Sequence, residues 1–415
     1  MKKVLSILLS VAMIVLCFAA CGKTDGDKSS TGKAANVKVG FIFLHDENST
    51  YDKNFITAAE EACKKAGVEI LKKTNISETQ ACYDAAAELV DEGCNVIFAD
   101  SFGHEPYIIQ AAKKFPEVQF LHATGTKAHT EGLSNYHNAF ASIYEGRYLA
   151  GVAAGMKLNE MISSGKITAD KAKMGYVGAY TYAEVISGYT SFYLGAKSVC
   201  PSVTMEVTFT GSWYDETAEK EAAQKLINNG CVLISQHADS MGAPTACEAA
   251  GVPNVSYNGS TVSACPNTFI VSSRIDWAPY LEYAIDCVKN GKAIDTDWTG
   301  TLSTGSVVLT DVNTKAAAEG TQAKIDEVKA ELEGGKLHVF DTSKFTVTVS
   351  DSKNKNATVD ADGHLTGYKA DIDSDADNTG DTEVVSDGYF HESEKRSAPC
   401  FDVQIDGITL LDTKF

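Results

Sequence analysis

Val37-Lys38-Val39-Gly40-Phe41-Ile42-Phe43-Leu44, at residues 37–44, is an almost unbroken apolar run with the length of a buried strand. Small and apolar residues then recur at helical spacing, namely Phe55, Ala59, Ala62, Cys63 and Ala66, and Gly67 follows them as a stop signal. A strand that is apolar along its whole length is typical of a parallel sheet, because helices cover both faces of such a sheet. This stretch therefore predicts the α/β class.

The alternation of strand and helix continues along the chain. Strands are expected at residues 68–71, 96–99 and 118–121, with helices at 77–92 and 105–115 between them. The pattern then restarts, with strands at 174–177, 205–209, 232–235, 252–257 and 269–272 and helices at 183–199 and 218–228. Regular alternation of this kind predicts two successive units, each a parallel sheet flanked by helices. The units join near residues 138–151, and a late helix at 280–288 is a candidate to return to the first unit.

Residues 341–415 differ in composition from the rest of the chain. They are rich in Asp, Ser, Thr and Gly, and residues 345–349 alternate like a strand. The segment also holds apolar side chains that need burial, namely Tyr389, Phe390, Phe401, Leu410 and Leu411. We therefore expect a β-rich C-terminal extension at 341–415. Within it, residues 371–377 are rich in aspartate but lack the glycine and the glutamate that complete a calcium-binding loop, which favours a solvated acidic loop.

The N-terminus has the pattern of an export signal. Lys2 and Lys3 precede an uncharged apolar run from Val4 to Ala19, and small residues lead to Cys21. A cysteine directly after two alanines resembles a bacterial lipobox, in which that cysteine is lipid-modified and becomes the first residue of the mature protein. This pattern predicts a signal peptide at 1–20, a lipid anchor at Cys21 and a polar, flexible tether at 21–36. An ordinary secretory signal without a lipid is the alternative.

Charge and cysteine content exclude several classes of protein. The formal net charge of −19 argues against nucleic acid as a partner, because phosphate contacts need basic patches. Nine cysteines follow the leader and its anchor, none of them in a Cys-x-x-Cys pair, so a zinc site or a disulfide framework is not expected. Most are expected to be small buried hydrophobic residues, and one or two disulfides remain open.

Candidate ligand-binding residues lie where strands end and helices begin. In open parallel sheets, ligands bind beyond the carboxyl ends of the strands. Aromatic and hydrogen-bonding side chains are dense at these positions, and the candidates are Tyr51, Asn54, Phe55, Ser101, Phe102, Glu145, Tyr180, Glu184, Trp213, Asp215, His237, Asp239, Asn258 and Trp277.

Each candidate also has a purely structural interpretation. Glu145 and Glu184 complete Ser/Thr-x-x-Glu patterns and so fit helix-capping boxes. Asp215 and Asp239 fit helix N-caps. Phe55, Trp213, Trp277 and Tyr51 fit the hydrophobic core. These alternatives stay open at the level of the sequence.

The motifs of common enzymes and metal sites are missing from the sequence. It contains no Gly-x-Ser-x-Gly elbow, P-loop, His-Glu-x-x-His or Gly-x-Gly-x-x-Gly motif. The histidines at the predicted strand ends lie on four different loops, so a metal site is not expected. We therefore expect a binding protein without catalytic residues, metal or cofactor.

Five stretches resemble the basic membrane protein family of substrate-binding lipoproteins, which includes the purine nucleoside receptors of ABC importers. They are Phe102-Gly103, residues 114–125 (KFPEVQFLHATG), Tyr144-Glu145-Gly146-Arg147-Tyr148-Leu149-Ala150-Gly151, Trp213-Tyr214-Asp215 and Gln236-His237-Ala238-Asp239-Ser240. The resemblance implies two lobes of the type I periplasmic-binding fold, joined by three crossings, with a ligand between them. It also implies an ABC permease and ATPase as partners, and it runs from about residue 37 to residue 340.

Applied to this chain, the resemblance implies a domain division. Lobe 1 is expected at 37–139 and 269–296, and lobe 2 at 140–268 and 297–340. Asp52-Lys53-Asn54-Phe55 is similar to a stretch of the nucleoside receptors in which the aromatic ring stacks on the base. In another branch of the family a Trp stands near Tyr51, so either Tyr51 or Phe55 is a candidate for the stacking ring.

The first functional hypothesis is a lipid-anchored, extracytoplasmic receptor of an ABC importer for a purine nucleobase or nucleoside. Stacked aromatic rings suit the faces of a flat base, and Asn, Asp, Glu and His side chains suit its edge. The alternatives are a receptor for a sugar or another small polar solute, a surface enzyme acting on nucleosides, and a sensor or adhesin whose acidic extension binds a partner. The missing catalytic motifs disfavour the enzyme.

Overall fold

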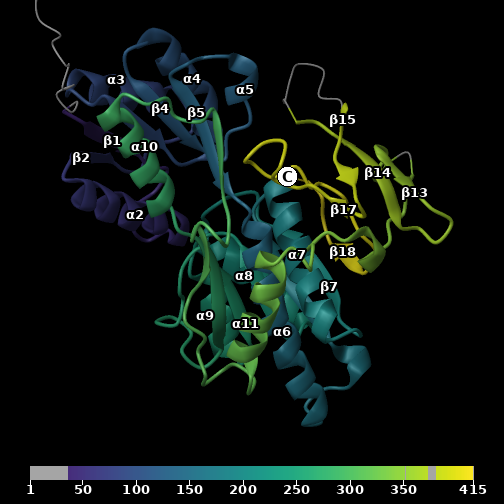
Figure 1. Cartoon of the computed structure of the whole chain (residues 1–415). Coiled ribbons are helices and arrows are strands. Elements are labelled where there is room, and N and C mark those ends of the chain that lie inside the picture. The colour runs from purple at the N-terminus through teal and green to yellow at the C-terminus, as the bar shows by residue number, and fades with distance from the viewer. Residues whose placement is uncertain (1–35, 351, 373–379, 415) are drawn as a thin grey trace, which may run out of the picture. The chain divides into compact units, whose positions relative to one another are not determined.

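The computed structural model describes residues 36–350, 352–372 and 380–414 (Figure 1). The expected signal peptide, the anchor at Cys21, the tether up to residue 35 and most of the acidic loop at 371–377 lie outside the described residues. Among the described residues, no helix combines the length and the apolar character that a membrane span requires.

The first lobe is built on a six-stranded sheet in the order β11-β5-β4-β3-β1-β2, and all of its strand pairs are parallel. The strands are β1 (Lys38–Ile42), β2 (Glu69–Lys73), β3 (Val96–Ala99), β4 (Gln119–Ala123), β5 (Tyr136–Ala141) and β11 (Asp297–Gly300). The helices are α2 (Thr50–Ala66), α3 (Gln80–Asp91), α4 (Glu105–Lys114), α5 (Ala128–Glu131) and α10 (Ala278–Asn290), with a 3₁₀ turn η1 at Phe102–His104.

Burial on both faces of this sheet explains its apolar strands. Along β3, Val96 and Phe98 join the core that contains α2 and α10, whereas Ile97 and Ala99 join the core under α3 and α4. Successive side chains of a strand point to opposite faces, so a strand covered on both sides must be apolar throughout. The α/β prediction is therefore confirmed, with the expected physical cause.

The second lobe is built on a seven-stranded sheet in the order β12-β10-β9-β8-β6-β7-β18. The strands are β6 (Lys173–Gly178), β7 (Thr204–Phe209), β8 (Leu233–His237), β9 (Asn254–Tyr257), β10 (Phe269–Ile275), β12 (Val307–Leu309) and β18 (Ile408–Leu410), and only β12 pairs antiparallel. The helices are α6 (Ile143–Ser163), α7 (Ala183–Val199), α8 (Glu216–Asn228), α9 (Gly242–Ala250) and α11 (Thr321–Glu333), with a 3₁₀ turn η2 at Ala169–Lys171.

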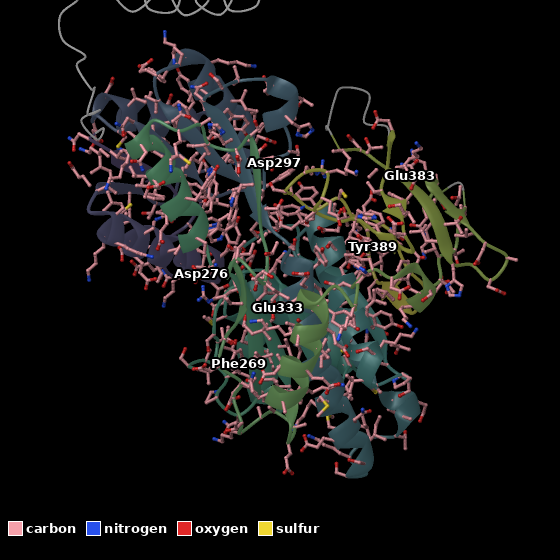
Figure 2. The ribbon with its side chains drawn as sticks, viewed as in Figure 1. Phe269, Asp276, Asp297, Glu333, Glu383 and Tyr389 are labelled. Atoms are coloured by element: carbon pink, nitrogen blue, oxygen red, sulfur yellow. The ribbon has the colours of Figure 1, made fainter. Side chains whose placement is uncertain are left out.

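Two strands lie in the opposite lobe from the one expected. β10 pairs with β9 in the second lobe, so the assignment of residues 269–275 to the first lobe is wrong. β11 pairs with β5 in the first lobe, so the assignment of 297–300 to the second is also wrong. Figure 2 shows Phe269 and Asp297 in different lobes, with Asp276 between them. The chain therefore changes lobe after β5, after β10 and after β11, and α10 packs beside α2 in the first lobe (Figure 1).

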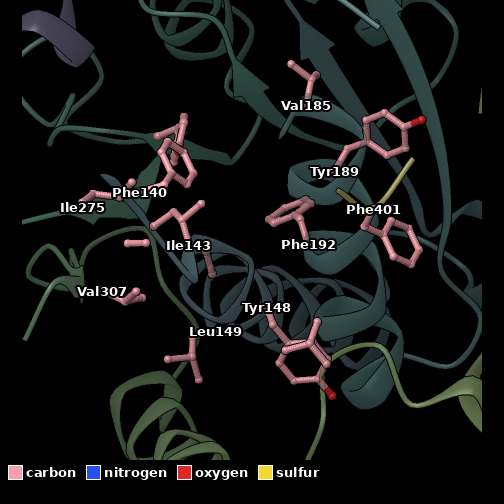
Figure 3. Close-up of a cluster of buried hydrophobic side chains, with 14 of the residues drawn as sticks. Phe140, Ile143, Tyr148, Leu149, Val185, Tyr189, Phe192, Ile275, Val307 and Phe401 are labelled. Carbon is pink, nitrogen blue, oxygen red and sulfur yellow. The ribbon is translucent and has the colours of Figure 1, made fainter. Parts of the chain in front are cut away.

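Helices α6 and α7 pack closely because glycines stand at their crossing. A Cβ built on Gly151 of α6 would lie 2.0 Å from the Phe192 carbonyl oxygen of α7. Reciprocally, a Cβ on Gly195 of α7 would lie 2.0 Å from the Tyr148 carbonyl oxygen of α6. Figure 3 shows the side chains of Tyr148 and Phe192 in the core around this crossing. The short backbone distance thus depends on the absence of a side chain.

The C-terminal segment forms small sheets and also completes the second lobe. It holds an antiparallel sheet of β13 (Ala357–Val359), β14 (Leu365–Ala370) and β15 (Thr382–Glu383), and a pair of β16 (Val385–Ser386) with β17 (Tyr389–Phe390), after a 3₁₀ turn η3 at Thr342–Lys344. β18 then adds to the edge of the second lobe beside β7. Phe401 is fully buried and stacks on Phe340 with the ring centroids 4.0 Å apart. The segment thus shares its core with the second lobe.

The cysteines of the described chain are small buried residues, as the sequence indicated. All nine, from Cys63 to Cys400, are buried with free thiols, so the disulfides that the sequence left open do not form among these residues. Burial raises the pKa of the Cys63 thiol to about 12, in keeping with an unreactive core residue.

Candidate functional site

An enclosed cavity lies between the two lobes, where the strands of both sheets end. The space open at its centre is about 20 Å³, room for about one water molecule, so the side chains of the closed lobes nearly fill the cavity. The first lobe contributes Leu44, His45, Tyr51, Asp52, Ser101, Phe102 and Thr124, and the second contributes Glu184, Trp213, His237, Asp239, Tyr257 and Asn258. Every lining residue ends a strand, follows one, or lies in the first turns of a helix. The parallel topology brings these positions together.

The lobes touch each other around this cavity. The backbone N–H of Thr50, at the start of α2, donates to the Asp239 carbonyl oxygen at 3.0 Å, and the Thr50 hydroxyl donates to the same oxygen at 3.2 Å. Phe102 packs against Tyr182 with the ring centroids 5.2 Å apart, and both rings are partly exposed. These contacts between lobes close the cavity in the described structure.

Aromatic rings from both lobes line the cavity. Tyr51 is held in place because its hydroxyl donates to the Asp100 carbonyl oxygen at 2.7 Å. Trp213 is half-buried and packs edge-on against Tyr180, with the centroids 5.1 Å apart. Tyr257 packs against His237 at 4.5 Å. The wall therefore offers flat apolar surfaces on the sides of both lobes, which suits the faces of a planar ligand.

Three carboxylates line the cavity, and none of the described lining residues is Lys or Arg. Burial is the main cause that raises the pKa of Asp239 well above its usual value, and the nearby carboxylates of Glu219 and Asp52 raise it further. Burial also opposes ionisation of Asp52, but hydrogen bonds from His45 and Ser49 outweigh it and lower the pKa of Asp52. The site thus carries negative charge and abundant hydrogen-bond acceptors.

Two polar atoms of the wall lack partners among the described residues. They are the Thr124 hydroxyl oxygen and the Tyr257 hydroxyl oxygen, both buried. A buried polar group without a hydrogen bond costs about 1–3 kcal/mol, so these atoms favour a polar ligand or water in the cavity.

The backbone is strained at two of the lining positions. Thr124 has a φ of 66° and Asn258 a φ of 65°, in the left-handed region. This region is unfavourable for the β-branched Thr124 in particular. Such strain collects at functional sites, where the surrounding structure imposes it.

Eight of the fourteen sequence candidates line the cavity. They are Tyr51, Ser101, Phe102, Glu184, Trp213, His237, Asp239 and Asn258. Asp239 is not an N-cap, because α9 begins after Met241, and its side chain accepts a hydrogen bond from Asn258 at 3.0 Å. Tyr180 does not line the cavity but packs against the Trp213 ring that does.

The other five candidates lie outside the cavity, and four of them have structural roles. Phe55 and Trp277 are each 1% exposed and stack on each other at 4.3 Å in the core of the first lobe, so Tyr51 and not Phe55 reaches the cavity. Asp215 is the N-cap of α8 and accepts from the Ala218 N–H at 2.9 Å. Asn54 donates to the Ile275 carbonyl oxygen, which lies at a crossing between the lobes.

Glu145 is the last candidate outside the cavity. It lies in the first turn of α6, directly after another crossing, and burial raises its pKa to about 7. Ser142 is the N-cap of α6, but its side chain makes no capping hydrogen bond, and its backbone N–H donates to the Gly300 carbonyl oxygen at 2.8 Å, so the capping box that the sequence suggested does not form.

The sequence prediction missed five lining residues: Leu44, His45, Asp52, Thr124 and Tyr257. Tyr257 is the last residue of β9, directly before Asn258. Thr124 and Leu44 come one and two residues after their strands. A rule that included the last strand residue and the next two would have found these three. Asp52 lies inside the first turn of α2, and no local signal separates it from an ordinary helix-start carboxylate.

Comparison with known proteins agrees with this architecture. The family described as "ABC transporter substrate-binding protein PnrA-like" (Bmp) matches residues 41–337. A purine-binding protein of Brucella abortus (strain 2308) is 31% identical over 310 residues, which cover 73% of this chain and 83% of that protein. TsgA13 of Haloferax volcanii, whose name assigns it to glucose binding, is 26% identical over 332 residues, which cover 78% of each chain.

A solved structure shares the fold. An ABC transporter solute-binding protein from Aeropyrum pernix K1 superposes with a TM-score of 0.61 at 17% identity, covering 76% of this chain and 94% of that one. The family match points to a substrate-binding transport protein that acts outside the cytoplasm, not to an enzyme. With the match spanning both lobes and the cavity between them, the chain belongs to the PnrA-like family of ABC transporter substrate-binding proteins.

Proposed function

We propose that this protein captures a purine nucleobase or nucleoside outside the cytoplasm and presents it to an ABC importer. The observation that carries the proposal is the enclosed cavity with aromatic rings from both lobes and a wall of hydrogen-bonding groups. Tyr51 and Phe102 on one side and Trp213 and Tyr257 on the other supply apolar surface for the two faces of a flat base. The purine-binding relative from Brucella abortus supports the same ligand class.

Polar side chains of the cavity lining can form hydrogen bonds with the edge of the ligand. Glu184 supplies a carboxylate acceptor for N–H or O–H donors, Asp239 supplies an acceptor oxygen and, in the protonated form that its raised pKa favours, an O–H donor, and Asn258 supplies both a donor and an acceptor. The unpartnered hydroxyls of Thr124 and Tyr257 supply further contacts. Hydrogen bonds to charged groups contribute about 1.5–3 kcal/mol each, so a ligand with several edge donors gains most.

The charge of the wall excludes nucleotides from this proposal. Asp52, Glu184 and Asp239 line the cavity, and the described lining residues include no cation that would neutralise a phosphate. Phosphate sites in proteins use Arg, Lys or helix N-termini. We therefore expect a ligand without a phosphate group.

A ligand panel tests the proposal directly. The purified protein is unfolded and refolded to remove bound solute, and its melting temperature is measured with purine bases, purine nucleosides, nucleoside monophosphates and monosaccharides. A base or nucleoside at a hundred times its Kd should stabilise the fold by about 2.7 kcal/mol, with no shift from the monophosphates. A shift with sugars alone would contradict the purine proposal.

A monosaccharide is the second candidate ligand. The hydrogen bond between Asn258 and Asp239 holds an amide and a carboxyl group side by side, and Trp213 also lines the cavity. Planar groups of this kind also form hydrogen bonds with sugar hydroxyls. The relationship to TsgA13 supports this alternative. The same panel separates the two candidates.

We further propose that the ligand leaves unchanged. Incubation of a bound nucleoside with the protein, followed by chromatography, should return the nucleoside intact. Free base and ribose in amounts that exceed the protein would instead identify a hydrolase.

We propose a lipid anchor at Cys21. Replacing Cys21 with serine should move the protein from the membrane fraction to the medium, because the acyl chains that hold it contribute about 0.8 kcal/mol per buried CH₂ group. Cys17→Ser in the same leader is the matched control and should stay with the membrane. Immunoblots of the two fractions measure the outcome, and a membrane-bound Cys21→Ser protein would contradict the anchor.

A further inference from the structure

Arg147 of α6 is buried beneath the cavity without a carboxylate partner in the described chain. It is 0% exposed, and its guanidinium lies 5.1 Å from the ring centroids of both Phe192 and Tyr257. Its Nη1 donates to the Ser256 carbonyl oxygen at 3.1 Å, and its Nη2 donates to the Ser235 hydroxyl at 2.8 Å. A buried cation therefore uses its fixed fork of donors to orient groups just behind the cavity wall.

One of these donors sets the direction of a short hydrogen-bond chain. Arg147 Nη2 donates to the Tyr176 hydroxyl at 3.0 Å, and that hydroxyl lies 3.3 Å from His237 Nδ1. Arginine has no acceptor, so the Tyr176 oxygen must accept from it. The Tyr176 hydrogen is then free to point at His237, and no other described acceptor bonds with it. His237 Nδ1 thus receives a hydrogen bond.

The second ring nitrogen of His237 completes the assignment. Burial lowers the pKa of His237, so the ring is neutral and carries one hydrogen. With Nδ1 accepting from Tyr176, that hydrogen is on Nε2, which lies 3.5 Å from Glu184 Oε1. His237 and Glu184 both line the cavity. This assignment also suits Glu184, because an ionised carboxylate accepts a hydrogen bond from an N–H and cannot donate one.

Space around His237 agrees with a fixed ring. A Cβ built on Gly188 of α7 would lie 2.6 Å from His237 Nδ1 and 3.4 Å from the Tyr176 hydroxyl. Any side chain at position 188 would therefore push the His237 ring away from the Tyr176 hydroxyl. On its other side the His237 ring packs against Tyr257.

We propose that Arg147 and Tyr176 are positioning residues that hold His237 as its Nε2–H tautomer, so that a ligand acceptor can take the Nε2–H that now faces Glu184 at 3.5 Å while a ligand donor bonds to the Glu184 carboxylate. A ligand edge with an acceptor next to a donor matches this pair. Adenine offers such an edge at N7 and N6, and guanine offers one at O6 and N1. The choice of ligand edge rests on the proposed function, whereas the tautomer does not.

Tyr176→Phe tests the proposal, with Tyr189→Phe as its matched control. Both tyrosines are buried, but the Tyr189 hydroxyl has no partner among the residues that the structure places, so its loss leaves the chain to His237 intact. Tyr176→Phe should weaken binding of adenine and guanine about 3- to 10-fold, the equivalent of one hydrogen bond. Tyr189→Phe should bind both bases as the parent does.

Nitrogen-15 NMR of the histidine rings supplies a readout that needs no ligand. The His237 signals, identified by their loss in His237→Gln, should show a protonated Nε2 and an unprotonated, hydrogen-bonded Nδ1 in the parent. The Nδ1 signal should move in Tyr176→Phe and stay in Tyr189→Phe. A protonated Nδ1 in the parent, or unchanged affinity and Nδ1 shift in Tyr176→Phe, would overturn the proposal. If neither base binds while the NMR result holds, the purine function fails and the positioning role stands.

Discussion

Trp213→Ala is expected to weaken binding of the purine ligand by about 5- to 150-fold, because one aromatic ring stacked on a base contributes about 1–3 kcal/mol. The Trp213 ring lines the cavity and is held edge-on by Tyr180. It is only half-buried, so its removal should reduce the free energy of unfolding by less than the loss of a core tryptophan, which costs about 3–5 kcal/mol. Isothermal titration with the best purine of the panel measures the affinity, and urea unfolding measures the stability.

Trp298→Ala is the matched control for this prediction. Trp298 is also partly buried and also packs on tyrosines, with Tyr280 at 5.1 Å, but it stands on β11 and does not line the cavity. Its loss should leave ligand affinity unchanged and affect stability alone. Equal affinity in Trp213→Ala and the parent would remove Trp213 from the binding site.

Gly195→Ala is expected to destabilise the second lobe by about 3 kcal/mol, although alanine is the better helix former by about 1 kcal/mol. The new methyl group would lie 2.0 Å from the Tyr148 carbonyl oxygen, which is backbone and has no rotamer to change. Helices α6 and α7 would have to move apart, opening the core that Figure 3 shows around Tyr148 and Phe192. Urea unfolding followed by tryptophan fluorescence measures the change.

Ser198→Ala, one turn further along α7, is the control for the helix itself. The Ser198 hydroxyl donates to the Gly195 carbonyl oxygen of its own helix at 2.8 Å and also has a side-chain hydrogen bond with Tyr148 of α6, so its loss should cost about 0.5–1.5 kcal/mol, well below the effect of Gly195→Ala. A stabilised Gly195→Ala protein would show that the helices do not meet at this glycine.

The lining of the cavity was partly predictable because strand ends are a local signal. Trp213, His237, Asp239 and Asn258 each follow or end a predicted strand, and parallel topology gathers such positions at one edge. The same rule also selected Phe55 and Trp277, which lie beside the site but face the core. Sequence spacing does not tell which face of the first helical turn meets the ligand, since both Tyr51 and Phe55 are aromatic and four residues apart.

By itself, the sequence determined the α/β class, the number of lobes and the sheet edge at which the cavity lies, because hydrophobic periodicity and strand ends are properties of short segments. The tertiary structure alone decided that β10 and β11 exchange lobes, that Tyr51 instead of Phe55 faces the cavity, and that Arg147 lies beneath His237. Each of these depends on which distant segments pack together: β10 on β9, Phe55 on Trp277, and α6 against the second sheet. Patterns within a short segment do not specify which distant segment it packs against, so only the folded chain reveals these partners.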